Sequence, residues 1–349
     1  MKVLITGATG FIGGHLLDHL ISLGFSVRCL VRDASKANRL QGKGVEIVVG
    51  DISDIESLNG LCRDIDYVFH AAALVDDWGS WDDFEKNTVL GTRNMLAAAT
   101  RENVSRFIHI SSVDVYDRKY LGSDKPRANE TTPLVHDHWP YYYARAKMLA
   151  EREVFDYYNR GDLAVTVIRP ATAYGAGDHV IMPKLIDFLR ELSFWITNYN
   201  PVVGLIHVDD LAKLCVKAVM SDKSIGQAYN ASSDEDICLK ELVGCICAAL
   251  KIAVPKHHFP YWLTSFVVKV FELCARLTNT RPIFDCGGLE FLTLDQRFDI
   301  TKAKVDFDWT PEVNFEIGFQ LFLNSVQKEA YYGPASNLPR IQPMGGNTL

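Results

Sequence analysis

The stretch TGATGFIG at residues 6–13 carries three glycines between an apolar run and a helical pattern. In this G-x-x-G-x-x-G spacing, Gly7 allows a tight turn, Gly10 lets the backbone approach a pyrophosphate and Gly13 lets a helix pack closely on a sheet. The helix that begins after such a loop points its N-terminus at the anion. Because the glycine loop directly follows an apolar strand at residues 2–6, we predict a dinucleotide-binding fold.

On both sides of this loop, and over the first two thirds of the chain, short β-branched runs alternate with helical patterns. We expect strands at residues 2–6, 26–31, 46–50, 67–71, 106–111 and 164–169, and helices at 11–23, 81–102, 142–159, 182–192 and 209–220. The strands are mostly continuous apolar runs, which is typical of parallel strands covered on both faces. The pattern predicts an α/β fold with a Rossmann-type doubly wound parallel sheet.

The regular alternation of strand and helix patterns ends after residue 174, which indicates a second, smaller and mostly helical domain that binds substrate. We expect residues 1–175 to form the dinucleotide-binding domain, to which residues 204–220 return through a strand at 205–208. Residues 176–203 and 221–330 are then the substrate domain. The end of the chain, 331–349, is rich in Gly, Pro and Asn and is expected to be a tail.

Composition limits the partners and the compartment. The 349 residues have a net charge of −7 without a basic block, which argues against a nucleic-acid partner. The eight cysteines show neither a C-x-x-C pair nor a zinc-like His/Cys spacing, so we expect no metal, reduced thiols and a cytoplasmic location. The apolar run at 2–6 is a strand rather than a signal peptide, and no uncharged stretch of about 18 apolar residues predicts a membrane span.

The end of the second strand should select the cofactor. Arg32 stands where an acid would bind the ribose hydroxyls of NAD, and Lys36 follows about one helical turn later. These cations favour NADP, whose 2′-phosphate they could neutralise. In the alternative, Arg32 is a solvated charge and Asp33 binds the ribose of NAD.

Two further strand ends carry residues that suit the same ligand. Asp51 and Ile52 close the third strand, where a carboxylate can accept the adenine amino group. The fourth strand ends in three alanines, Ala71, Ala72 and Ala73, over which a cofactor can pass. Ligands of open α/β sheets bind at the carboxyl ends of the strands, so these residues are expected to meet at one site.

A pair suited to proton transfer begins the helix expected at 142–159. Tyr143 and Lys147 are four residues apart and therefore share a helix face. Lowering a tyrosine pKa from about 10 to about 7 requires about 4 kcal/mol. One ammonium about 4 Å away supplies that at an effective dielectric constant of about 20. We therefore expect Tyr143 to act as the acid/base and Lys147 to lower its pKa.

The choice of the catalytic tyrosine and of the serine that faces the site has alternatives. Tyr141 also has a base four residues on, at Arg145, so spacing alone does not reject it, whereas Tyr142 is expected to pack. The fifth strand ends in Ser111 and Ser112, whose side chains should face opposite ways, so that one of them meets the site.

In its motifs the chain resembles the extended short-chain dehydrogenases/reductases. The motifs are TGATGFIGG at 6–14, GDI at 50–52, HAAA at 70–73, NTVLGTRNML at 87–96, ISSVDVY at 110–116, YARAK at 143–147, RPATAYGAGD at 169–178 and IHVDDLA at 206–212. The resemblance covers about residues 2–212 in family order. It implies that Ser112 positions the substrate, that Tyr143 and Lys147 act as above, and that Pro170 and the backbone after it contact the nicotinamide.

From the loop, the strand ends and the resemblance together, a set of residues is expected to contact the cofactor. These residues are Gly7, Thr9, Gly10, Phe11, Ile12, Gly13, Arg32, Lys36, Asp51, Ile52, Ala71, Ala72, Ala73, Tyr143, Lys147, Pro170 and Thr172.

Departures from other family branches narrow the expected substrate. Sugar dehydratases carry Thr-Asp-Glu where this chain has Ser112, Val113 and Asp114, and the segment at 201–206 lacks the arginine that pairs a sugar nucleotide's diphosphate. The pattern is similar to the 3β-hydroxysteroid dehydrogenase and dihydroflavonol reductase branches, which implies a secondary alcohol or ketone on a bulky, apolar skeleton such as a sterol or flavonoid. The alternatives are a nucleotide-sugar epimerase with tightly bound NAD and a non-catalytic NADP-binding sensor.

Five aromatic residues, Trp78, Trp81, Trp139, Phe194 and Trp195, are expected either to line an apolar pocket or to pack a domain interface. The apolar segment 259–277 is best interpreted as a buried helix of the small domain, and otherwise as a lid or as a helix in peripheral contact with a membrane. The helices at 81–102 and 142–159 could form a homodimer, as they do in related enzymes.

Overall fold

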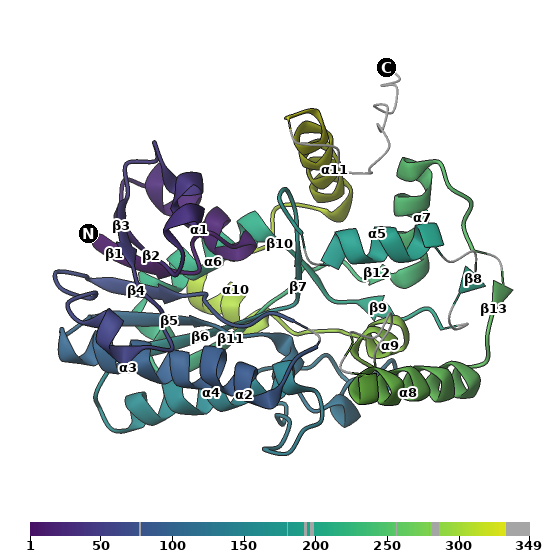
Figure 1. Ribbon diagram of the computed structural model, residues 1–349, viewed down its shortest axis with the longest axis horizontal. Helices are drawn as coiled ribbons and strands as arrows, with labels where there is room; N and C mark the ends of the chain where they lie inside the picture. Colours follow the sequence, from purple (N-terminus) through teal and green to yellow (C-terminus); the bar gives the residue numbers. More distant parts are fainter. Residues whose placement is uncertain are drawn as a thin grey trace.

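The computed structural model describes residues 1–76, 78–179, 181–191, 194–195, 199–255, 257–278, 280 and 286–332. Its centre is a parallel sheet of seven strands in the order β11-β6-β5-β4-β1-β2-β3 (Figure 1). The strands are β1 (Lys2–Thr6), β2 (Ser26–Val31), β3 (Glu46–Val49), β4 (Tyr67–His70), β5 (Arg106–Ile110), β6 (Val165–Pro170) and β11 (Gln227–Ala231). The expected α/β fold with a Rossmann-type sheet is confirmed, and the strand bounds agree to within one residue.

Helices cover both faces of this sheet. The helices of the described residues are α1 (Phe11–Ser22), α2 (Trp81–Phe84), α3 (Gly91–Arg101), α4 (Tyr142–Asn159), α5 (Ile181–Glu191), α6 (Val208–Val219), α7 (Leu239–Leu250), α8 (Tyr261–Thr278), α9 (Cys286–Thr293), α10 (Thr301–Phe307) and α11 (Phe315–Tyr332). The pair α1 and α6 lies on one face, and α3 and α4 lie on the other (Figure 1). A π-helical segment, Glu85–Leu90, joins α2 to α3.

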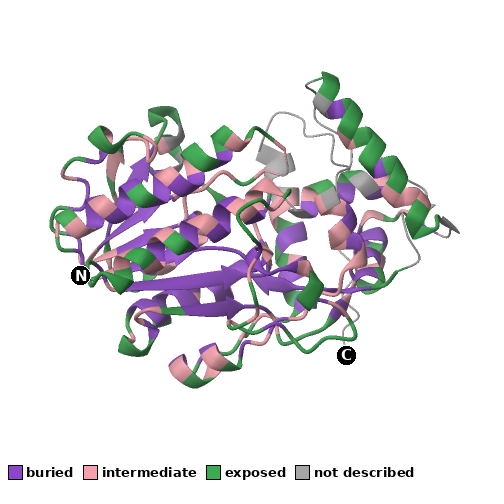
Figure 2. Cartoon of the chain, turned by 90° about the horizontal axis from the view of Figure 1, so that it is seen from below, coloured by how far each residue is buried: buried purple, intermediate pink, exposed green. Residues whose placement is uncertain are grey.

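The first strand shows why the sheet needs helices on both sides. Val3 and Ile5 point into the core beneath α1 and α6, whereas Leu4 between them points into the core beneath α3. All three side chains are fully buried, and the strands form the buried centre of the molecule in Figure 2. Side chains alternate along a strand, so a strand that is apolar at every position is stable only between two apolar layers.

The prediction that residues 205–208 return to the main sheet is wrong. β10 (Leu205–His207) pairs with β7 (Thr172–Tyr174), which continues the chain of β6 beyond the edge of the sheet. The seventh place in the sheet is taken by β11 instead, which pairs with β6. The sequence of β11 gave little signal because it includes a buried asparagine, Asn230, whose amide donates to Ala128 O and Asp299 O.

Beside the sheet, a second apolar core is formed by α5, α7, α8, α9 and α11 (Figure 1). Two short strand pairs lie there, β9 (Val202–Val203) with β12 (Ile237–Cys238), and β8 (Phe194–Trp195) with β13 (His257–His258). α10 packs on β11 and α6 instead. We keep the two-domain division as a proposal, with β11 and α10 moved to the dinucleotide-binding part.

Two expectations about the C-terminal third need correction. Tyr331 and Tyr332 belong to α11 rather than to a tail, and residues 333–349 lie outside the described residues. The segment at 259–277 forms α8 as a helix, but it is not buried, because most of its large apolar side chains are exposed. Within the described residues, no helix is long and apolar enough to cross a membrane.

Candidate active site

A pocket of about 1090 Å³ lies at the carboxyl ends of the parallel strands. One wall is formed by the residues that follow β1 to β6 and by the start of α4, and the other by α5 and α9. The order of the sheet reverses between β1 and β4, and ligands of doubly wound sheets bind at such a point. The pocket is therefore where the fold itself places a ligand.

The glycine loop forms one end of this pocket and has room for a dinucleotide. Gly7 has a φ of +77°, and a Cβ atom there would lie 2.9 Å from Ala72 N. A Cβ atom on Gly13 would lie 2.2 Å from Gly7 O, so only glycine permits α1 to approach the loop. α1 begins after Gly10 without a side-chain cap, which leaves its first N–H groups available to an anion. These residues fit the pyrophosphate of NAD or NADP.

The adenosine end of the pocket contains one cation and two acids. Arg32 is exposed and lines the pocket, as do Asp33 and Asp51. Asp33 Oδ1 accepts a 2.8 Å hydrogen bond from Ser35 N, and Asp51 Oδ1 accepts one of 2.8 Å from Ser53 N. The side chain of Lys36 lies outside the described residues.

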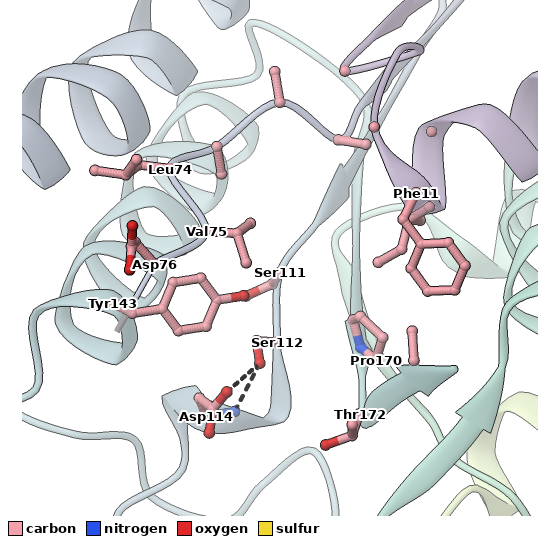
Figure 3. Close-up of a pocket in the computed structure, with 18 of the residues that line it drawn as sticks. Phe11, Leu74, Val75, Asp76, Ser111, Ser112, Asp114, Tyr143, Pro170 and Thr172 are labelled. Atoms are coloured by element: carbon pink, nitrogen blue, oxygen red, sulfur yellow. Dashed lines mark hydrogen bonds between the residues drawn. The ribbon is translucent and has the colours of Figure 1, made fainter. Parts of the chain in front are cut away.

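Tyr143 and both serines reach the same part of the pocket. Figure 3 shows the Tyr143 ring pointing into the pocket toward Ser111 and Ser112. The expected alternation does not separate the two serines, because β5 ends at Ile110 and both lie in the turn beyond the regular strand. Ser112 Oγ donates to Asp114 Oδ2 at 2.9 Å and accepts from Asp114 N at 3.1 Å. Ser111 Oγ is buried and has no hydrogen-bond partner among the described residues.

Lys147 lies beneath this group and does not line the pocket. Its side chain is buried, and Nζ donates a 2.8 Å hydrogen bond to Ile110 O at the end of β5. Burial lowers the pKa of Lys147 to about 8, while the nearby carboxylate of Glu151 raises it. The ammonium is therefore mostly charged at neutral pH, one helical turn from Tyr143.

The three consecutive tyrosines have different surroundings. Tyr142 packs edge-on against Trp81 and Phe84, as expected for a packing residue. Tyr141 lines the pocket with Tyr143, and their ring centroids are 6.0 Å apart. The base four residues after Tyr141 is Arg145, whose guanidinium lies 3.6 Å over the Trp81 ring. Pocket position alone therefore does not exclude Tyr141.

Of the five aromatic residues expected to line a pocket or to pack an interface, the three tryptophans that the structure describes do not line the pocket. Trp81 packs with Tyr142, and Trp139 stacks edge-on with His136, while Trp78 is also absent from the pocket lining. The side chains of Phe194 and Trp195 lie outside the described residues. The pocket is nevertheless largely apolar. Its apolar side chains include Phe11, Leu74, Val75, Val113, Leu121, Leu185, Phe291, Leu292, Leu294 and Phe298.

Among the charged pocket residues that were not predicted as site residues, Asp114, Arg118 and Glu290 are linked to one another. Arg118 donates from Nη2 to Asp114 Oδ1 at 3.0 Å and from Nε to Glu290 Oε2 at 2.9 Å. Burial disfavours the charged guanidinium, but Asp114 and Glu290 outweigh it and raise the pKa of Arg118. The chain Ser112–Asp114–Arg118–Glu290 thus crosses from the sheet to α9. Glu290 lies 172 residues after Arg118, so no local pattern could have joined them.

Most of the predicted site residues come together in this pocket. Those that line it are Gly7, Thr9, Gly10, Phe11, Ile12, Gly13, Arg32, Asp51, Ile52, Ala71, Ala72, Ala73, Ser112, Tyr143, Pro170 and Thr172.

Comparisons with known proteins agree on the fold. A family model described as "NAD dependent epimerase/dehydratase family" matches residues 3–232. The 2-alkyl-3-oxoalkanoate reductase of Shewanella oneidensis is 27% identical, covering 90% of this chain and 84% of that protein. The sterol-4-alpha-carboxylate 3-dehydrogenase (decarboxylating) of Mus musculus is 24% identical, covering 90% and 88%. The solved structure described as "Crystal structure of gox2253" superposes with a TM-score of 0.78 at 26% identity, covering 94% and 98%.

Proposed function

The chain belongs to the NAD dependent epimerase/dehydratase family. We propose that it interconverts a secondary alcohol and a ketone on a bulky, apolar substrate of the sterol or flavonoid type. One observation carries this proposal. The hydroxyl-bearing side chains of Tyr143 and Ser112 line one pocket, and the buried ammonium of Lys147 lies one helical turn behind the tyrosine.

We assign the proton transfer to Tyr143. The positive charge of Lys147 favours the tyrosinate form, because the buried ammonium acts through a medium of lower dielectric than water. Tyr143 then takes the proton of a substrate hydroxyl, or returns it to a ketone oxygen. Bound NAD or NADP would accept or supply the hydride at the same carbon.

Ser112 is assigned to hold the substrate oxygen. In this structure the Ser112 hydroxyl donates to Asp114 Oδ2. Turned toward a substrate, the same O–H can donate to a hydroxyl or a ketone oxygen, which leaves the proton of a substrate hydroxyl to Tyr143. This arrangement orients an alcohol in front of Tyr143. Asp114 acts here as a positioning residue, because its contact is with Ser112.

We propose NADP as the preferred cofactor. Arg32 is exposed at the end of β2 and can pair with a 2′-phosphate. Asp33 Oδ1 caps the short helix after it by accepting from Ser35 N, and Asp33 remains the ribose ligand in the alternative that NAD is bound. Binding of NAD in preference to NADP would contradict this assignment.

The substrate class is supported by the lining and by two relatives. Leucine, valine and phenylalanine side chains line the pocket, and Leu74 and Val75 lie on the same side of it as Tyr143 (Figure 3), which suits an apolar skeleton. The names of the Shewanella and mouse relatives describe a 3-oxoalkanoate and a sterol carboxylate. We therefore add carboxylated substrates, a 2-alkyl-3-oxoalkanoate and a 4-carboxysterol, to the steroids and flavonoids that should be tried.

The test is turnover of a substrate panel, followed by the absorbance of the reduced nicotinamide. We expect net NADPH oxidation or NADP reduction with a steroid, a flavonoid or one of the two carboxylates. Conversion of a UDP-sugar without net change in cofactor would instead identify a nucleotide-sugar epimerase. Tight NADP binding without turnover of any substrate would identify a sensor.

A homodimer is part of the same proposal. α3 and α4 pack side by side on one face of the sheet, joined by an ion pair between Arg93 and Glu153 of 2.6 Å. We expect their outward faces to meet those of a second copy. Sedimentation equilibrium of the purified chain would give a monomer mass if this is wrong.

A further inference from the structure

α8 exposes an unusual amount of apolar surface. Trp262 is 70% exposed, Phe266 64% and Leu277 79%, and Leu273 is also largely exposed. These four side chains are spaced by four, seven and four residues, which places them along one face of the helix. We call this row the α8 stripe. Large apolar patches of this kind usually mark an interaction site.

The face that α8 turns toward the protein is the opposite one. Val268 and Ala275 are 3% and 4% exposed, and they lie seven residues apart on that inner face. An ordinary surface helix buries its large apolar residues and exposes polar ones. α8 buries two small apolar side chains and exposes its largest ones, so its outer face is suited to a partner rather than to water.

The charge of this segment indicates the kind of partner. Residues 256–281 contain four basic residues, Lys256, Lys269, Arg276 and Arg281, and one acidic residue, Glu272, a net charge of +3. The whole chain has a net charge of −7. Lys269 is exposed beside the stripe, where its long side chain can reach past an apolar layer to an anionic surface. An aromatic and apolar face with flanking cations is typical of helices that lie in an anionic lipid surface.

The position of α8 relates this face to the pocket. α8 packs against α9, at the end of the molecule far from β1 to β3 (Figure 1). α9 in turn contributes Phe291 and Leu292 to the pocket wall. A surface that contacts α8 is therefore only one helix away from the pocket.

We propose that α8 lies in the headgroup region of an anionic lipid membrane, with the α8 stripe inserted at the boundary of the acyl chains. Lys269 then contacts lipid phosphates. The helix lies in the surface and does not cross it, in keeping with its length and its charges. α9 then lies between α8 and the pocket, so that an apolar ligand can be exchanged close to the lipid.

The test is cosedimentation of the purified full chain with sucrose-loaded vesicles. One set of vesicles is phosphatidylcholine alone, and the other also contains phosphatidylglycerol. We expect binding to the anionic vesicles, weakened by added salt because the headgroup attraction is screened. The double variant Trp262→Ser/Phe266→Ser should bind at least about tenfold more weakly, since each ring leaves the acyl boundary. Lys269→Glu should reduce binding to the anionic vesicles much more than to the neutral ones.

Matched controls keep this test specific. Val305 on α10 and Ile317 on α11 are exposed apolar residues away from α8, so Val305→Ser/Ile317→Ser should bind vesicles like the unchanged chain. Cofactor binding and thermal unfolding of each variant verify its fold.

An equal loss of vesicle binding in the control variant, or no vesicle binding by the unchanged chain, would overturn the proposal. So would a dimer in vesicle-free solution that Trp262→Ser/Phe266→Ser abolishes, because a second copy would then cover the stripe. None of these readings requires turnover, so they stand apart from the proposed reaction.

Discussion

Glu151 of α4 and Arg169 of β6 form a buried ion pair, with 2.6 Å between Oε2 and Nη2 and 3.0 Å between Oε1 and Nε. Their side chains are 1% and 4% exposed. Glu151 lies one helical turn after Lys147, so the pair fixes the face of α4 that carries Lys147 and Tyr143. Arg169 Nη1 also donates to the hydroxyl of Tyr116 at 3.0 Å.

Arg169→Met should destabilise the fold strongly. The substitution leaves the carboxylate of Glu151 buried without its partner, which typically costs about 3–5 kcal/mol. Urea unfolding followed by circular dichroism measures the change. The control is Arg152, which lies on α4 next to Glu151 and pairs with Asp137 at an exposed site. Arg152→Met should lower the free energy of unfolding by at most about 1 kcal/mol. Equal losses would show that the buried pair contributes nothing special.

Tyr143→Phe should abolish turnover and leave cofactor binding nearly unchanged. The ring keeps its place in the pocket wall, and only the hydroxyl that exchanges the proton is lost. Tyr141→Phe is the matched control, because this neighbouring residue also lines the pocket. Steady-state rates and cofactor titrations distinguish the two. If Tyr141→Phe lost turnover and Tyr143→Phe did not, the assignment of the acid/base would be reversed.

The buried ammonium of Lys147 should make stability rise with pH. Burial lowers the pKa of Lys147 from 10.5 to about 8, so the folded chain binds fewer protons than the unfolded chain between these two values. The free energy of unfolding contributed by Lys147 therefore increases from about pH 8 toward pH 10.5. Lys147→Met should remove this increase. Urea unfolding of both chains at the two ends of the window measures it, and parallel pH dependences would contradict the prediction.

Arg32→Ala should weaken NADP binding about tenfold or more and NAD binding far less. A charge-assisted hydrogen bond to phosphate contributes roughly 1.5–3 kcal/mol, and NAD offers no phosphate at that position. Arg101→Ala is a suitable control, since Arg101 is exposed at the end of α3 and does not line the pocket. Fluorescence titration with both cofactors gives the ratio. A similar loss for NAD and NADP would mean that Arg32 does not read the 2′-phosphate.

The sheet and the sheet-side wall of the pocket could be predicted because their signals are local. β1 is an apolar run that ends in a glycine loop, and the residues after each strand must meet at one edge of a parallel sheet. The opposite wall could not be predicted in this way. Glu290 reaches Arg118 only because α9 folds back across the pocket, and a contact over 172 residues leaves no periodicity in the sequence.

β11 and α8 show two further limits of local patterns. β11 is polar at Asn230, yet it is buried, because that amide is satisfied by two backbone carbonyls. α8 is apolar, yet it is exposed, because composition reveals how apolar a helix is but not whether the protein or something else covers it. The burial of β11 and the exposure of α8 are both set by neighbours that are distant in the sequence.

The ion pair between Arg118 and Glu290 ties the two walls of the pocket together. Any opening that swings α9 away from the sheet must first separate these charges. Because both side chains also line the pocket, the distance between its two walls depends on an ion pair that a bound ligand can contact.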